Sequence, residues 1–230
     1  STALAIYLPF DVNTSAKNRT YDYTANNNDG IVQGNATVNA TISDGMIGFG
    51  ISNFKVNISD SSSWQILANE HYSVSLWFKA DSSPSTGQFF FTRSSGSNVN
   101  GIDVVYQTAN GNLLHRVIET GTTTTVSFNG SQFIDNRWHH VVVGRNSTRH
   151  YMFIDNILRN TTADATLGPL NSSAGLFLGA VNSGLVITNR TIDEFMWLKN
   201  QSLNASDVSF IYNNQSSRFF SRGEQTFQVN

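Results

Sequence analysis

Apolar and polar residues alternate along much of the chain. In the segment YSVSLWFK, residues 72–79, every second position from Tyr72 to Phe78 is apolar, and the positions between them include two serines. This period of two is typical of a β-strand with one face buried and the other exposed to solvent. The segment is therefore predicted to form a half-buried strand.

Similar short segments recur along the chain, separated by Gly, Asn, Ser and Asp. They are ALAIYLPF, MIGFGISNFKVNI, GQFFFTR, GIDVVYQ, NLLHRVIE, TTTVSFN, RWHHVVVGR, HYMFI, ILRN, GLFLG and TIDEFMWL. Many short strands with turn residues between them predict an all-β fold, a two-sheet sandwich of antiparallel strands. Asp155 and Asn156 both tolerate a positive φ angle, and they predict a two-residue type I′ hairpin turn.

One helix is expected in LNASDVSFIYNN, residues 203–214. Asn204 can cap its first turn, and Asp207, three residues later, completes a capping box. Val208, Ile211 and Tyr212 then follow at helical spacing. Because no internal repeat or linker is found, the 230 residues predict one large domain.

Composition narrows the function classes. Charged residues make up 13% of the chain and the net charge is −2, with no basic run, so no nucleic-acid partner is expected. No segment approaches the roughly 20 uninterrupted apolar residues of a membrane helix, so no membrane span is expected. The absence of cysteine excludes disulfides and thiolate metal sites. The chain starts at Ser1 without a signal peptide and is interpreted as a processed, mature product.

Asparagine carries the strongest compositional signal. The chain has 27 Asn and 49 Ser or Thr, from which chance would place about 6 Asn-x-Ser/Thr tripeptides, whereas 13 occur, none with a central proline. A surface that is merely rich in Asn, Ser and Thr is the alternative. The excess instead predicts N-linked glycans on a secreted protein, located extracellularly or at a cell or virion surface. The acceptors are Asn13, Asn18, Asn35, Asn39, Asn57, Asn129, Asn146, Asn160, Asn171, Asn189, Asn200, Asn204 and Asn214.

Six segments also occur in a recognisable order. They are YLPFD, YDYTANNNDGIV, GMIGFGISNF, YSVSLWFKA, RWHHVVV followed by YMFIDN, and TIDEFMWLKNQSLNASDVSFIYNN. In this order they resemble the LamG-like jelly-roll domains of the concanavalin A-like lectin/glucanase superfamily, from about Leu8 to Asn213. The resemblance implies a two-sheet antiparallel jelly-roll sandwich with one short C-terminal helix over residues 1–213. Residues 214–230 are then a C-terminal extension.

Enzyme activity is not expected. Hydrolases that share this fold carry two catalytic carboxylates in a Glu-x-Asp-x-x-Glu pattern, which this sequence lacks. Asp193 and Glu194 are adjacent on a predicted strand and are expected on opposite faces, so they cannot act as acid and nucleophile together. Neither a nucleophile elbow nor a phosphate-binding glycine loop is found. A glycoside hydrolase is kept as a distant alternative.

His139 and His140 invite a metal-site interpretation because they are adjacent. Consecutive strand residues point to opposite faces, so the two imidazoles are not expected to converge on one ion. A third and a fourth ligand at metal-binding spacing are also missing. Both histidines are predicted to be structural.

Calcium is the metal that the resemblance implies. Relatives bind Ca²⁺ near the opening loop, and the matching residues are Asp22, Asn26, Asn28 and Asp29, joined by Asp193 from the late strand. These side chains offer the hard oxygen ligands that Ca²⁺ prefers. The alternative is a loop of Asx turns, held by hydrogen bonds and pinned by Asp193.

The sequence is compatible with two functions, and one of them is preferred. The chain is predicted to be a non-catalytic, heavily N-glycosylated, extracellular structural or adhesive glycoprotein, because dense glycosylation suits a surface component. The alternative is a calcium-dependent lectin module with a glycan ligand. Sugar recognition needs exposed aromatic faces, for which Trp64, Trp77 and Trp197 are candidates, although each could instead lie in the core.

Self-association is predicted through the C-terminal extension, residues 214–230. Phe227 and Val229 are spaced as in a strand. This segment could pair with the first strand of its own sandwich. It could instead add a strand to a neighbouring subunit, and such a head-to-tail contact, repeated without closure, would build a filament.

Overall fold

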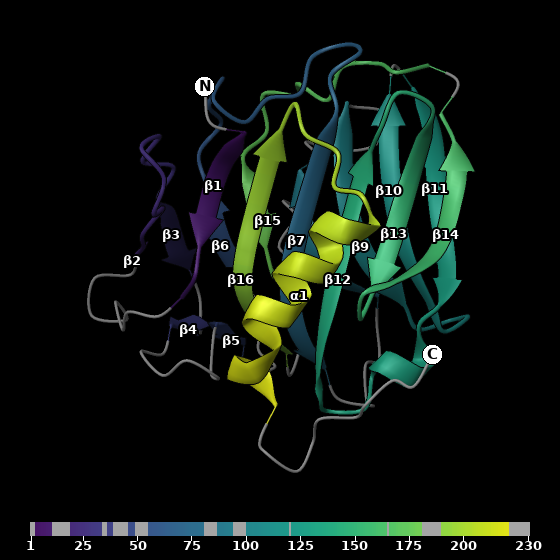
Figure 1. Ribbon diagram of the computed structural model, residues 1–230. Helices are drawn as coiled ribbons and strands as arrows, with labels where there is room; N and C mark the ends of the chain where they lie inside the picture. Colours follow the sequence, from purple (N-terminus) through teal and green to yellow (C-terminus); the bar gives the residue numbers. More distant parts are fainter. Residues whose placement is uncertain are drawn as a thin grey trace.

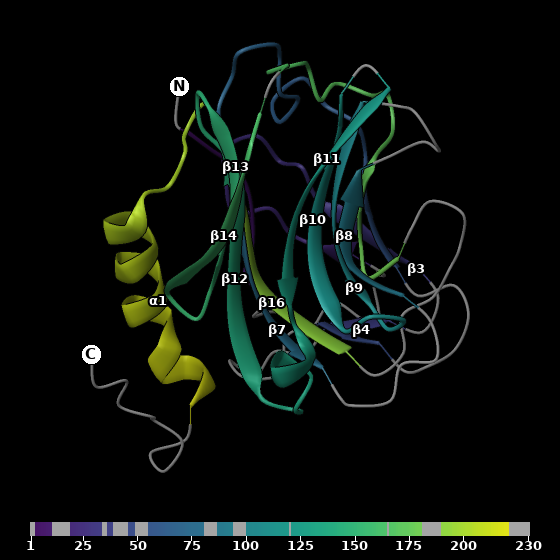
Figure 2. The same ribbon diagram turned by 90° about the vertical axis from the view of Figure 1, so that its right-hand side faces the viewer.

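The computed structural model describes residues 3–10, 19–33, 36–38, 46–48, 55–80, 87–93, 100–119, 121–164, 166–180 and 190–220. These residues form two antiparallel sheets packed face to face, with a helix on the outer face of one sheet (Figures 1 and 2). The predicted two-sheet sandwich with one C-terminal helix is confirmed. No helix in the described ranges is long and apolar enough to cross a membrane.

The sheet beneath the helix is called the helix-side sheet. In the described residues of this sheet, β1 (Leu4–Leu8) pairs with β16 and is not part of the linear strand order. That order is β14 (Ile157–Ala163), β13 (Arg149–Ile154), β12 (Trp138–Arg145), β7 (Tyr72–Ala80), β16 (Arg190–Lys199), β5 (Met46–Gly48) and β4 (Ala36–Val38).

The second sheet is called the opposite sheet. A short 3-10 helix, η2 (Ser131–Phe133), follows its edge strand β11. Its strands lie in the order β11 (Thr122–Asn129), β10 (Asn112–Glu119), β9 (Gly101–Gln107), β8 (Gln88–Arg93), β15 (Leu176–Leu178), β6 (Lys55–Ile58), β3 (Gly30–Gln33) and β2 (Arg19–Thr20).

One predicted strand proves to be two. MIGFGISNFKVNI contains β5 and β6, which belong to different sheets, and residues 49–54 between them lie outside the described residues. The short strands β2, β3 and β4 were not predicted, because two to four residues carry too little periodicity to separate a strand from a loop.

The main core lies between the two sheets. Trp64 and Trp197 are fully buried there, with ring centroids 5.6 Å apart in an edge-on arrangement, and Tyr72 stacks on Trp197. The alternation in β7 therefore places its apolar positions as predicted. However, Ser73, Ser75 and Trp77 on the other face are also fully buried, so the strand is not half-buried.

The reason is the helix α1 (Ala205–Phe219), which covers the outer face of the helix-side sheet (Figure 2). Its predicted start is confirmed. The Asn204 side chain accepts hydrogen bonds from the backbone nitrogens of Ser206 and Asp207, and the Asp207 carboxylate accepts one from the Asn204 nitrogen. This reciprocal capping box satisfies amide groups that the first turn would leave unpaired.

The predicted end of the helix is wrong. The helix continues beyond Asn214 to Phe219, and the domain boundary predicted at residue 213 falls inside it. Phe219 is buried, and its ring stacks on Trp77 with centroids 4.3 Å apart. This packing overrides the weak helix preference of the intervening polar residues. Residues 221–230 lie outside the described residues, and strand pairing by them stays a prediction.

The β13–β14 hairpin turn is confirmed. Asp155 and Asn156 have φ angles of 50° and 64°, as a type I′ turn requires. Further along β14, the Asn160 side-chain nitrogen donates to the Ser127 carbonyl at 2.7 Å, and the Thr162 hydroxyl donates to the Thr125 carbonyl at 2.9 Å. Side chains of one edge strand thus bind the backbone of β11, the edge strand of the other sheet.

Candidate functional site

The opening loop is organised around Asp22. Its Oδ1 accepts hydrogen bonds from the backbone nitrogens of Tyr7 and Thr24, both at 3.0 Å. Its Oδ2 accepts from the Thr24 hydroxyl and from the Asn28 nitrogen, both at 2.8 Å. Protein donors therefore bind both carboxylate oxygens that were expected to face a cation.

The other loop residues also point donors inward. The side-chain nitrogens of Asn26 and Asn28 donate to the Ala5 carbonyl at 3.0 and 2.9 Å. Asp29 accepts from the Asp22 nitrogen at 2.8 Å and pairs with Arg19 at 3.1 Å. This geometry fits the Asx-turn alternative and does not fit a Ca²⁺ site, which needs converging oxygens. Calcium binding stays a prediction for a binding measurement.

Asp193 and Glu194 correct the expectation of strand alternation. Ile192 and Phe195 both pack in the core between the sheets, so the two residues between them lie on the outer face. A β-bulge in β16 causes this, and Glu194 has a φ of 52°. Asp193 pairs across the sheet with Trp77.

The Glu194 carboxylate is fully used in holding the helix. Oε2 accepts hydrogen bonds from the Tyr7 hydroxyl at 2.7 Å and from the Gln215 side chain at 2.9 Å, and Oε1 forms an ion pair with Arg218. The bulge thus turns a strand carboxylate toward α1. The shared face alone does not make the two acidic residues a catalytic pair.

His139 and His140 lie on opposite faces, as predicted. The His139 ring packs against Phe133 in the interior, whereas His140 lies under the helix beside Trp77, with its Nε2 2.8 Å from the Ser75 hydroxyl. Burial lowers the pKa of His140 to about 4. Burial also acts to lower the pKa of His139, but hydrogen bonds and charges of two aspartates outweigh it and raise that pKa.

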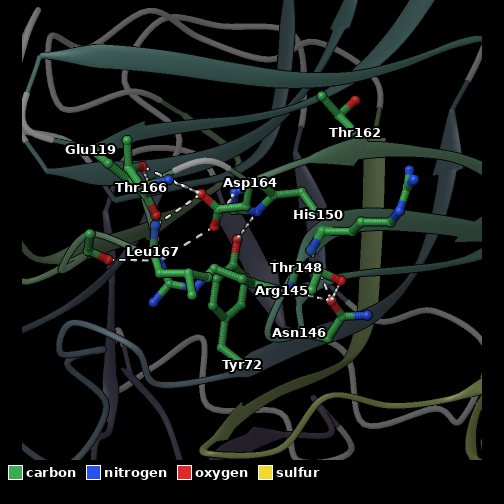
Figure 3. A network of polar contacts seen from close by, with 12 residues as sticks. Tyr72, Glu119, Arg145, Asn146, Thr148, His150, Thr162, Asp164, Thr166 and Leu167 are labelled. Carbon is green, nitrogen blue, oxygen red and sulfur yellow. Dashed lines mark hydrogen bonds and ion pairs between the residues drawn. The ribbon is translucent and has the colours of Figure 1, made fainter.

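A buried polar network lies between the sheets (Figure 3). Glu119, His150 and Asp164 offer ligand atoms within 4.8 Å of one another, which would suit a metal ion by distance alone. However, the Arg145 guanidinium pairs with Glu119 and lies 4.0 Å from Asp164 Oδ2, and His150 Nε2 lies 2.9 Å from the same oxygen. The arginine already supplies the compensating cation, so this network is a structural ion cluster.

Tyr72 extends the network toward β10. Its hydroxyl lies 3.1 Å from His115 Nε2 and 3.5 Å from His150 Nδ1. Burial, together with the neighbouring His150, lowers the pKa of His115 to about 3, and burial lowers the pKa of His150 to about 4. Sequence spacing gave no sign of this cluster, because β10, β13 and the segment after β14 are distant along the chain.

A pocket opens where the end of α1 meets the start of β12. Its volume is about 150 Å³. The walls come from the end of β7, the loop before β12, the β13–β14 turn and the last turns of α1. The lining residues are Lys79, Asp135, Asn136, Arg137, Trp138, His139, Asp155, Tyr212, Phe219 and Phe220.

One side of this pocket is aromatic. Trp138 packs on Phe219 with ring centroids 4.8 Å apart, and Tyr212 and Phe220 continue the wall at 6.5 Å. The tryptophans named from the sequence do not form it: Trp64 and Trp197 are core residues, and the fully buried Trp77 lies under the helix. Trp138 is the tryptophan that lines the pocket, and its partner in the aromatic wall is Phe219 at the end of α1.

The polar residues that line the pocket are held by hydrogen bonds. His139 lies between two carboxylates, with Nδ1 2.7 Å from Asp155 Oδ2 and Nε2 3.0 Å from Asp135 Oδ1. The Asn136 nitrogen donates to the Ala80 carbonyl at 2.7 Å, and the Arg137 nitrogen donates to Asp135 at 2.9 Å. These bonds fix the loop before β12 against the end of β7.

The predicted glycan acceptors are accessible where they are described. Six of them are exposed, two are partly exposed and none is buried among Asn57, Asn129, Asn146, Asn160, Asn171, Asn200, Asn204 and Asn214. The remaining acceptors, Asn13, Asn18, Asn35, Asn39 and Asn189, lie outside the described residues. Glycosylation itself stays a prediction.

Comparisons with known proteins agree on the fold. A family model described as the concanavalin A-like lectin/glucanases superfamily matches residues 52–209. No curated protein sequence matches the chain.

Several solved structures superpose on nearly the whole chain. The botulinum neurotoxin serotype G binding domain matches with a TM-score of 0.75 and 15% identity, over 93% of this chain and 51% of that chain. The serotype D ligand-binding domain, solved in complex with N-acetylneuraminic acid, matches with 0.71 and 17%, over 93% and 51%. The binding domain of Paraclostridial Mosquitocidal Protein 1 matches with 0.72 and 14%, over 92% and 52%. At these identities the likeness establishes the fold alone, and the chain spans about half the length of each.

Proposed function

The chain belongs to the concanavalin A-like lectin/glucanase superfamily, and we propose that it is a non-catalytic recognition module that binds a glycan in the pocket at the end of α1. The observation that carries this proposal is that aromatic side chains and polar side chains held by hydrogen bonds line the same small cavity. Sugar rings have an apolar face and a rim of hydroxyl groups, so a site of this composition suits them.

The size of the pocket limits the ligand. Pockets for drug-sized molecules measure roughly 300–1,000 Å³, and this one has about 150 Å³. It therefore suits one sugar ring, such as the terminal residue of a longer glycan. Similar solved structures include a receptor-binding domain and a ligand-binding domain in complex with N-acetylneuraminic acid, which supports a role in recognition.

The contacts of the carboxylates in the pocket support a non-catalytic role. In the pocket, Asp135 and Asp155 both face the same imidazole of His139, and Asp155 Oδ1 also accepts from the His140 nitrogen at 2.9 Å. Glycoside hydrolysis needs one carboxyl group that gives a proton and another that attacks or activates water. Carboxylates held by an imidazole and by backbone amides are better placed to orient a ligand.

The wider setting proposed for this module is extracellular. The excess of Asn-x-Ser/Thr tripeptides supports an N-glycosylated structural or adhesive protein at a cell or virion surface. Self-association through the C-terminal segment remains part of this proposal. None of the calcium ligands predicted from the sequence lines the pocket, so we expect sugar binding to persist in chelator.

A glycan array tests the proposal, run in calcium and in chelator. The native chain is expected to bind one class of terminal sugar, and Phe220→Ala, which shortens the aromatic wall, should abolish that binding. Phe210→Ala is the matched control, because Phe210 is 72% exposed on the same helix and does not line the pocket. Absence of binding to any glycan under both conditions would contradict the proposal.

A further inference from the structure

We infer that the pocket selects a sugar bearing a carboxylate, an inference that rests on the proposed glycan site and adds the charge of its ligand. The argument concerns which charged groups of the pocket are already paired and which are left to meet a ligand.

The acidic side chains are already paired. Asp155 Oδ2 lies 2.7 Å from the Nδ1 atom of His139, and Asp155 Oδ1 accepts from the His140 backbone nitrogen at 2.9 Å. Asp135 Oδ1 lies 3.0 Å from the Nε2 atom of His139 and accepts from the Arg137 backbone nitrogen at 2.9 Å. His139 lies between the two carboxylates, and each carboxylate also accepts a hydrogen bond from a backbone nitrogen.

The basic side chains retain most of their donors. The Arg137 side chain is 65% exposed, and its Nε lies 3.9 Å from Asp135 Oδ2, too far for a hydrogen bond. Within the described residues Lys79 forms no ion pair. The uncommitted charge that lines the pocket is therefore positive.

The backbone places both cations beside the aromatic wall. Lys79 on β7 is the direct cross-strand partner of Trp138 on β12, so the two side chains share a face and are neighbours. Arg137 precedes Trp138 in a loop that two hydrogen bonds from backbone nitrogens hold in position. A sugar ring against the aromatic wall would thus carry its substituents toward an ammonium and a guanidinium group.

A carboxylate fits this pair of cations. The planar guanidinium fork matches the geometry of a carboxylate and can bind it through two parallel hydrogen bonds, while lysine adds a point charge. The backbone that carries Arg137 is held by its hydrogen bond to Asp135, and the backbone that carries Lys79 is held by strand pairing.

The test compares three simple probes by calorimetry or ligand-observed NMR on the full chain: a methyl glucuronide, the neutral methyl glucoside and a glucoside sulfate ester. The glucuronide is expected to bind about tenfold more tightly than the glucoside, the scale of one charge-assisted hydrogen bond. The double variant Lys79→Gln and Arg137→Gln should remove that preference and leave neutral-sugar binding in place. Arg149→Gln is the matched control, because Arg149 is an exposed cation on β13, outside the pocket.

The outcomes separate the two proposals. Equal binding of the glucuronide and the glucoside overturns the inference and leaves the glycan site intact. Tighter or equal binding of the sulfate ester overturns the choice of carboxylate. A glycan array without any binding overturns the proposed function, and the inference with it. A preference that survives in the double variant places anion recognition elsewhere and also overturns the inference.

Discussion

The indole nitrogen of Trp77 donates a hydrogen bond to Oε1 of Gln215, 2.9 Å away, and so joins the centre of the helix-side sheet to the last turns of α1. The same Gln215 donates to Glu194, so one helix residue links two strands. Phe219 and Tyr212 stack on the Trp77 ring at 4.3 and 5.4 Å. The helix end, and with it one wall of the pocket, therefore depends on Trp77.

We expect Trp77→Ala to lower the free energy of unfolding by about 3–5 kcal/mol, as large aromatic truncations in cores do. Gln215→Ala should cost about 1–3 kcal/mol, because it leaves the buried indole N–H without its partner. Urea denaturation measures both changes. Phe210→Ala, on the exposed side of the same helix, is the control and should stay within about 0.5 kcal/mol of the native chain. Equal losses in all three variants would contradict the anchoring role.

The bulge at Glu194 makes a second prediction. Glu194→Ala removes the bonds to Tyr7, Gln215 and Arg218 and keeps a side chain at a φ of 52°. Glu194→Gly removes the same bonds but relieves the strain, so it should be more stable than the alanine variant by about 1 kcal/mol. The urea denaturation midpoints of the alanine and glycine variants measure this difference in stability. An alanine variant as stable as the glycine variant would show that the bulge is not strained.

Acid should destabilise the fold. The pKa values of His140 and His150 are about 4 and that of His115 is about 3, all below the ordinary 6.5. The folded state therefore binds fewer protons than the unfolded state, and stability falls as the pH drops from about 6.5 toward 4, by at most about 3 kcal/mol for each histidine at pKa 4.

His139 acts in the opposite direction. Its raised pKa contributes stability that is present below about 6.5 and is lost as the pH rises through its folded pKa. Urea midpoints from pH 8 to 4 measure the sum, and His140→Asn should reduce the loss on the acid side. Replacing both His139 and His140 by asparagine should lower the free energy of unfolding by about 1–3 kcal/mol through lost hydrogen bonds. A midpoint that does not change between pH 7 and 4 would rule out the neutral buried histidines.

Glycosylation can be tested at a single acceptor. After expression in a eukaryotic secretory pathway, the intact mass should exceed the bare 25.3 kDa, and glycopeptides should include Asn146. At Asn146 the side-chain oxygen accepts from the Thr148 nitrogen at 3.0 Å, which leaves the amide nitrogen for a sugar. Thr148→Val should remove this glycan alone, whereas Thr148→Ser should keep it. A mass of 25.3 kDa would exclude glycosylation altogether.

The helix end also decides how self-association should be tested. Truncation after Asn214 would remove Gln215 and Phe219 and would unseat the helix. Truncation after Phe220 removes only residues 221–230. We expect the full chain to associate and this shortened chain to be a monomer by light scattering, with unchanged stability. A monomeric full chain, or a shortened chain that associates equally well, would exclude the terminal segment as the contact.

Local signals in the sequence were sufficient for the sandwich, the hairpin turn and the start of the helix, because alternation, turn residues and a capping box are set by neighbouring residues. The bulge at Glu194 and the continuation of the helix to Phe219 depend on partners distant along the chain, such as Tyr7 and Trp77. The pocket could not be predicted for the same reason. Trp138 forms part of the pocket wall together with Phe219, which it contacts and which is distant along the chain.

The side chains of Asn160 and Thr162 have a consequence for how the molecule meets its copies. The backbone carbonyl groups of Ser127 and Thr125 lie on the edge strand β11. They accept hydrogen bonds from Asn160 and Thr162 of β14, the edge strand of the other sheet, at 2.7 and 2.9 Å. An incoming chain would find these acceptors occupied, so this flank resists the strand-to-strand growth that bare sheet margins permit. Polymerisation by strand exchange, if this chain uses it, must start from another flank of the sandwich.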